Sequence, residues 1–168
     1  TKEDFPITQL SEEISYFNEE LENGKGFIVI RGLPIERYTD DEAAIIYYGL
    51  GLHMGTPVPQ NIKGDMLGHV RNIGEVDTKH VRVYETNEYL PYHADLSDVV
   101  GLLCLRKAKS GGMSSLSSAM TLYNEILEKH PEYLGLLHRL FLLEHLNDGD
   151  PGLTPIFSHH KGKLSARY

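Results

Sequence analysis

The chain has 168 residues, of which 40% are hydrophobic and 24% charged, and its net charge is -8. This size and composition predict one soluble globular domain with its own core, over residues 1–168. The negative charge argues against nucleic-acid binding and against an anionic membrane surface, and the apolar runs are far shorter than the roughly 20 residues of a membrane span.

The N-terminus and the single cysteine indicate where the chain resides. Thr1-Lys2-Glu3-Asp4 has no basic region followed by an apolar one, so we expect no signal peptide there. Cys104 lies within an apolar run, which is typical of a small buried hydrophobe rather than a nucleophile. One cysteine excludes an internal disulfide, which fits a reducing compartment, so we expect a cytoplasmic protein, with a homo-oligomer left open.

The first third of the chain predicts two helices around a strand. Residues 11–22 read as a helix that Ser11 caps, with an apolar stripe and a stop at Gly24. Residues 26–31 are rich in β-branched side chains and predict a strand. Thr39 and Glu42 form a capping-box pattern, so a second helix should start there and end near Gly51.

The middle of the chain predicts strands and loops. Short strands are expected at 56–59 and 66–71, and the alternating stretch 80–86 predicts a half-buried strand. Residues 99–105 are apolar except for glycine, so we expect a strand buried on both faces. The basic residues that follow it are interpreted as a solvated strand end rather than an anion site, and they are Arg106, Lys107 and Lys109.

The last third predicts helices followed by a hairpin. Gly111-Gly112 should turn into a short strand at 113–117, and residues 118–129 predict a helix. Leu134, Leu137, Leu140 and Phe141 predict another helix. A polar loop at 147–152 then leads to a hairpin of 154–159 and 163–168, which turns at Lys161-Gly162. By pattern alone the fold class is α+β.

The pair His93 and Asp95 is the main candidate for chemistry. Side chains two residues apart face the same way on an extended chain and opposite ways on a helix. An imidazole and a carboxylate together suit a divalent transition metal, and one further His would complete a facial triad. A His and an Asp two residues apart occur often by chance, so the neighbouring residues must show whether this pair is a metal site.

Those surroundings resemble a known family. Several stretches between residues 84 and 125 are similar to the taurine catabolism dioxygenase (TauD/TfdA) family. They are Tyr84-Glu85-Thr86-Asn87, the run from His93 to Leu105, Ser110-Gly111-Gly112-Met113-Ser114, Ser117-Ser118 and Tyr123-Asn124-Glu125. The resemblance extends to Gly55-Thr56-Pro57 and to residues 157–168. It implies a mainly β fold with flanking helices, namely a clavaminate synthase-like jelly roll (double-stranded β-helix).

The resemblance also implies an activity and its cofactors. Members of that family are Fe(II)- and 2-oxoglutarate-dependent dioxygenases, which use O2 to hydroxylate a small organic molecule and release succinate and CO2. His93 and Asp95 match two iron ligands, and Ser114 matches a hydroxyl residue that binds the far carboxylate of 2-oxoglutarate. Residues just before the motif face the substrate in the family, so Tyr92 and Asn87 are candidates there. Gln60 and His69 are further candidates.

Two elements of the family pattern are not found in this chain, namely the distal His ligand and the Arg that pairs with 2-oxoglutarate. We expect a longer protein to supply both beyond Tyr168. The alternatives are that His159 or His160 is the third ligand, or that the chain is a short relative without oxygenase activity. The rival function is therefore a non-catalytic metal- or ligand-binding jelly-roll module. A metal-dependent hydrolase is less favoured because no second His or carboxylate motif has suitable spacing.

Overall fold

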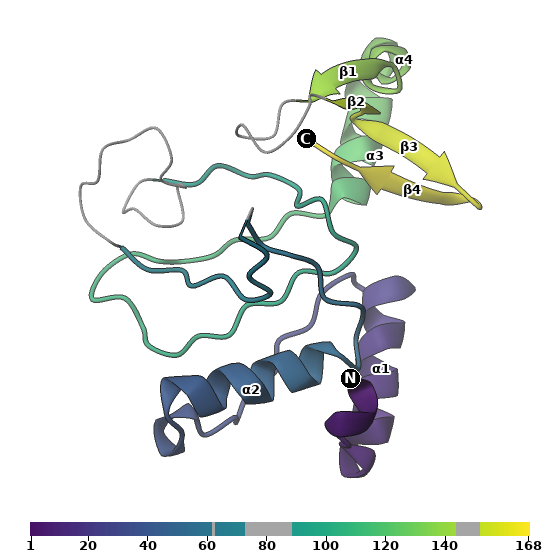
Figure 1. Cartoon of the computed structure of the whole chain (residues 1–168). Helices are drawn as coiled ribbons and strands as arrows, with labels where there is room; N and C mark the ends of the chain where they lie inside the picture. Colours follow the sequence, from purple (N-terminus) through teal and green to yellow (C-terminus); the bar gives the residue numbers. More distant parts are fainter. Residues whose placement is uncertain (62, 73–88, 144–151) are drawn as a thin grey trace. The chain divides into compact units, whose positions relative to one another are not determined.

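The structure is a computed structural model of the whole chain, and it describes residues 1–61, 63–72, 89–143 and 152–168 (Figure 1). The chain divides into two compact units. The first comprises Thr1–His69 and Ser97–Met113, and the second comprises Val70–Leu96 and Ser114–Tyr168. The single domain that the sequence predicts over residues 1–168 stays a prediction.

Helix α1 of the first unit spans Ser11–Glu22, as the sequence predicts, but Ser11 is not its cap. The short 3-10 helix η2 (Thr8–Leu10) leads directly into α1, so Leu10 takes the N-cap position and makes no side-chain cap. Ser11 already has helical dihedral angles, and its carbonyl oxygen accepts a hydrogen bond from Ser15 Oγ at 2.8 Å. Ile14 is the buried residue of this helix.

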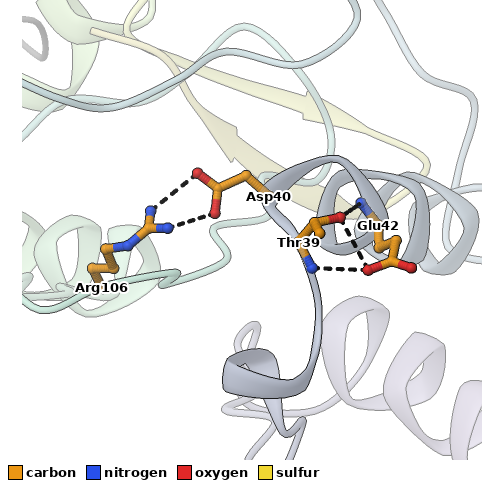
Figure 2. Close-up of polar contacts among 4 residues, drawn as sticks. All are labelled: Thr39, Asp40, Glu42 and Arg106. Atoms are coloured by element: carbon orange, nitrogen blue, oxygen red, sulfur yellow. Dashed lines mark hydrogen bonds and ion pairs between the residues drawn. The ribbon is translucent and has the colours of Figure 1, made fainter.

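Helix α2 (Asp40–Gly51) starts at the predicted capping box, which Figure 2 shows in close-up. The backbone N–H of Glu42 donates to Thr39 Oγ1 at 3.2 Å, and the backbone N–H of Thr39 donates to the Glu42 carboxylate at 2.8 Å. These two bonds satisfy N–H groups that have no partner inside the helix. Ala43, one turn further on, is 1% exposed and belongs to the core of this unit.

The described residues of the second unit contain helix α3 (Ala119–Lys129), the short helices η5 (Pro131–Tyr133) and α4 (Leu134–Leu137), and four short strands (Figure 1). Ser118 caps α3 by accepting the N–H of Thr121 at 3.2 Å. Among the apolar residues of α3, Tyr123 and Ile126 are half-buried, whereas Leu122 and Leu127 are exposed. Among the described residues, no helix is long and apolar enough to cross a membrane.

The helix predicted over Leu134 to Phe141 is wrong beyond Leu137. Strand β1 (Leu140–Leu143) pairs antiparallel with β2 (Gly152–Pro155), and Phe141 lies opposite Thr154. Leucine and phenylalanine suit both a helix face and a strand, and here the ladder with β2 decides in favour of the strand. The periodicity of side chains within one segment does not show that the segment pairs with another strand further along the chain.

The predicted hairpin is confirmed at its turn. Strand β3 (Phe157–His160) pairs antiparallel with β4 (Lys163–Ala166), and His160 lies opposite Lys163. Lys161 and Gly162 between them have φ values of 49° and 80°, the left-handed region that a two-residue hairpin turn requires. Phe157 is 1% exposed and packs edge-to-face with Tyr123 at a ring centroid distance of 5.1 Å, so it belongs to the core of this unit.

Several predicted strands do not form in the part of the chain that the structure describes. Residues 26–31, 56–59, 66–71, 99–105 and 113–117 have no strand, because no described segment pairs with them. Their apolar side chains are largely exposed, as Val29 at 69% and Leu102 at 75% show. Cys104 is also exposed, so its predicted burial is wrong. The strand predicted at 80–86 and most of the loop at 147–152 lie outside the described residues.

Candidate metal centre

His93 and Asp95 lie side by side in a stretch of the second unit without regular secondary structure. The Nε2 atom of His93 is 3.9 Å from Oδ1 of Asp95. Their side chains are 43% and 52% exposed, so solvent reaches both groups. The spacing of two residues thus places the imidazole and the carboxylate on one side of the chain, as expected for an extended segment.

Two backbone carbonyls hold this segment. The Nδ1 atom of His93 lies 2.8 Å from the carbonyl oxygen of Pro91. The backbone N–H of Ala94, between the two candidate ligands, donates to the carbonyl oxygen of Tyr168 at 3.2 Å. Tyr168 follows β4, so the hairpin supports the middle of the motif directly.

The geometry of the pair fits two positions around one metal ion. Two donor atoms that each lie about 2.1 Å from an ion are about 3 Å apart when the angle at the ion is a right angle. The 3.9 Å between Nε2 and Oδ1 is close enough to that value that a small change in the torsion angles of Asp95 brings both atoms to one ion. An imidazole and a carboxylate are two of the three ligands of the 2-His-1-carboxylate iron site.

The described part of the chain places no third ligand beside them. Among residues 1–61, 63–72, 89–143 and 152–168, no group of three His, Cys, Asp or Glu side chains is placed to hold a metal. The ring of His159 instead stacks on that of His138 at a centroid distance of 5.3 Å, and each of the two rings makes a T-shaped contact with Tyr123. The hypothesis that His159 or His160 completes the triad therefore gains no support from the described residues.

The other candidate residues take different places. Ser114 belongs to the same unit as His93 and is exposed, two residues after Gly112, whose φ is 68°. Tyr92 is 51% exposed and directly precedes His93. Asn87 lies outside the described residues, within 73–88. Gln60 and His69 are exposed residues of the first unit.

The basic residues after the apolar run 99–105 do not mark a strand end, because no strand forms there, and the first of them pairs with a carboxylate. Arg106 donates two hydrogen bonds to the carboxylate of Asp40, at 2.7 and 3.1 Å, across 66 residues of sequence (Figure 2). The Arg106 guanidinium holds the pKa of Asp40 below its ordinary value, and the charge of His69 adds to this effect. Sequence reasoning missed this ion pair, since nothing local pairs Asp40 with Arg106.

The supporting contacts at Pro91 and Tyr168 were also missed. Both use a backbone carbonyl, which every residue carries, so residue type gives no signal for them. The pairing of Ala94 with Tyr168 could have been sought only by asking which segment satisfies the backbone N–H of the motif.

Comparison with known proteins places this chain within a family. Residues 1–166 match the model of a family described as "Taurine catabolism dioxygenase TauD, TfdA family". The chain is 38% identical over 170 residues to FR-33289 synthase of Streptomyces rubellomurinus, which covers 97% of this chain and 50% of that protein. It is 27% identical over 175 residues to the taurine hydroxylase-like protein SAT17 of Stachybotrys chartarum, over 99% of this chain and 46% of that protein. The chain spans about half the length of these curated relatives.

Proposed function

The chain belongs to the taurine catabolism dioxygenase (TauD/TfdA) family, and on this premise we propose that the protein is an Fe(II)- and 2-oxoglutarate-dependent dioxygenase that hydroxylates a small organic molecule. The observation that carries the proposal is the approach of His93 Nε2 to Asp95 Oδ1, at 3.9 Å, in a chain that matches the family from residue 1 to 166. The donor types and their spacing are those that an iron site of this class uses.

His93 and Asp95 would hold the iron. The imidazole supplies a nitrogen ligand that suits Fe(II), and the carboxylate reduces the net charge of the site. With 2-oxoglutarate and O2, such a centre supplies the oxidant that hydroxylates a C–H bond, with release of succinate and CO2. A third histidine ligand, and an arginine for the far carboxylate of 2-oxoglutarate, belong to the proposal although this chain does not identify them.

We assign binding of 2-oxoglutarate to Ser114 and binding of the substrate to residues that precede His93. The hydroxyl of Ser114 would donate a hydrogen bond to the far carboxylate of 2-oxoglutarate, and a charge-assisted bond of this kind is stronger than a neutral one. Tyr92 and Asn87 would contact the substrate and hold its reactive carbon near the metal, since correct placement of reactants contributes strongly to rate. Asn87 is proposed from the family pattern alone.

The proposed fold is the family's jelly roll, in which the unpaired segments of the described chain become strands. Residues 26–31 and 99–105 have strand-like sequences, and their apolar side chains are exposed in the structure, with Val29 at 69% and Leu102 at 75%. Exposed apolar segments that pair with no described strand are what we expect of strands whose neighbours are not among the described residues. This exposure supports the proposed fold without identifying the partner strands.

A non-catalytic binding module is the alternative, and the relatives do not favour it. One relative is named a synthase and the other a taurine hydroxylase-like protein. The two hypotheses differ in turnover, because a binding module forms no product.

The test is formation of succinate by the intact protein. We expect succinate only when Fe(II), 2-oxoglutarate and O2 are all supplied together with a suitable small organic substrate, and we expect His93→Ala to abolish it. His130→Ala is the matched control, because His130 is an exposed histidine of the same unit that pairs with Glu132 at 3.4 Å and lies outside the proposed centre. Succinate formation that survives His93→Ala would show that His93 is not an iron ligand.

A further inference from the structure

The hydrogen bond of the His93 ring decides which of its nitrogens is available to a metal. Nδ1 lies 2.8 Å from the carbonyl oxygen of Pro91, and a carbonyl oxygen can only accept a hydrogen bond. The hydrogen in this contact is therefore on Nδ1. A neutral imidazole carries one N–H, so Nε2 is left with its lone pair exposed.

That lone pair belongs to the nitrogen nearer the carboxylate. Nε2 is the ring atom that lies 3.9 Å from Oδ1 of Asp95. With the opposite tautomer, the lone pair of Nδ1 would face the lone pairs of the Pro91 oxygen, and the hydrogen on Nε2 would block the metal position. The contact with Pro91 thus fixes both the tautomer and the direction of the ring.

We propose that the carbonyl group of Pro91 is a positioning group that selects Nε2 of His93 as the metal-binding atom. This inference rests on the proposed metal-binding role of His93. It assigns to a backbone group two residues upstream the role that a carboxylate or carbonyl often plays behind a metal-binding histidine.

The backbone torsions that precede this carbonyl are restricted. The proline ring fixes φ of residue 91 near -65° and favours an extended conformation for Leu90. On the other side of His93, the N–H of Ala94 is bound to the Tyr168 carbonyl at 3.2 Å. The His93 side chain is 43% exposed, so little packing holds its ring, and the hydrogen bond with the Pro91 carbonyl restrains it.

The experiment must change the carbonyl rather than the proline ring. Replacing Tyr92 by its α-hydroxy acid converts the peptide bond between residues 91 and 92 into an ester, whose carbonyl is a weaker acceptor of nearly the same shape. The same replacement at Leu90 is the matched control, because it changes the carbonyl of Tyr89 instead. Nitrogen NMR of the imidazole reports the tautomer in the metal-free protein, and titration with Zn(II) reports which nitrogen binds and how tightly.

For the unmodified protein we expect the Nδ1–H tautomer at a pH where His93 is neutral, and Zn(II) should bind at Nε2. The ester at residue 92 should weaken Zn(II) binding about tenfold, as changes to groups behind metal ligands do, and should increase the Nε2–H tautomer. The ester at residue 90 should change neither.

Two results overturn the inference while leaving His93 as a ligand. They are an Nε2–H tautomer in the unmodified protein, and Zn(II) affinity that the ester at residue 92 does not change. The tautomer measurement needs no variant, so a poorly folded ester does not prevent the test. If Zn(II) leaves the NMR signals of His93 unchanged, that result contradicts both the proposed function and the inference.

Discussion

The guanidinium of Arg106 binds both carboxylate oxygens of Asp40, with N–O distances of 2.7 and 3.1 Å (Figure 2). Asp40 is the first residue of α2, and Arg106 directly follows the apolar run 99–105. The pair therefore attaches that run to the start of a helix within the first unit. Parallel N–H donors matched to a carboxylate give this ion pair a defined geometry.

We predict that Arg106→Gln raises the pKa of Asp40 toward its ordinary value. The two hydrogen bonds from Arg106 are the largest cause of the lowered pKa, and the nearby His69 charge is a smaller one. Carboxyl-carbon NMR during an acid titration measures the change. Lys107→Gln is the control, and an equal shift in that variant would mean that general surface charge, not the ion pair, lowers the pKa.

The same pair predicts how stability depends on pH. Because folding lowers the pKa of Asp40, the pair contributes its full stability above the ordinary pKa of an aspartate. That contribution is lost as the pH falls through the lowered pKa. Urea unfolding at a series of acidic pH values should show a steeper loss for the unmodified protein than for Arg106→Gln. Parallel curves would contradict the assignment.

Alanine substitutions at Gly49 and Gly51 in α2 should have different effects on the stability of the protein. A methyl group at residue 49 would overlap the ring of Phe5, whereas at residue 51 it would meet open space. Alanine ordinarily stabilises a helix, but overpacking costs about 1–3 kcal/mol. We expect Gly49→Ala to reduce the free energy of unfolding by about 1 kcal/mol, and Gly51→Ala not to reduce it.

Denaturant unfolding measures both glycine variants. Adding Phe5→Ala to Gly49→Ala should remove part of the penalty, because neighbouring substitutions are not additive. If the effects of Phe5→Ala and Gly49→Ala simply add, the two residues are not in contact.

The backbone angles in the turn of the β3–β4 hairpin favour a substitution that should stabilise the protein. Lys161 has φ of 49°, a conformation that asparagine adopts more readily, and Asn-Gly is a preferred pair in such turns. Lys161→Asn should raise the free energy of unfolding by about 0.5 kcal/mol. Gly162→Ala should lower it, because φ is 80° there and a Cβ atom is strained. A thermal unfolding series measures both, and a loss of stability in Lys161→Asn would argue against this turn.

The elements that the sequence predicted well are those with local causes. Helix α1 follows from an apolar stripe, α2 from the Thr39 capping box, and the hairpin turn from Lys161-Gly162. Each signal lies within a few residues of the structure that it specifies. Even there the exact cap of α1 was misplaced, because the preceding turn of 3-10 helix moved it to Leu10.

The features that the sequence did not predict depend on backbone groups, most of them far apart along the chain. Residues 99–105 have a strand-like composition, yet a strand forms only when another strand bonds to it, and no described segment does so. Leu140–Leu143 is a strand because Gly152–Pro155 pairs with it. For the candidate centre, the spacing of His93 and Asp95 indicated their shared side, whereas their support from the Pro91 and Tyr168 carbonyls has no signature in residue type.

The most direct test of the proposed function is an anaerobic titration of the intact protein with Fe(II) and 2-oxoglutarate, followed by visible absorption. Chelation of the iron by 2-oxoglutarate produces a charge-transfer band. We predict that the band appears, that Asp95→Ala abolishes it, and that Asp98→Ala, which removes an exposed carboxylate three residues further along the chain, leaves it unchanged. Iron binding without any band would contradict the 2-oxoglutarate-dependent function and would favour the binding module.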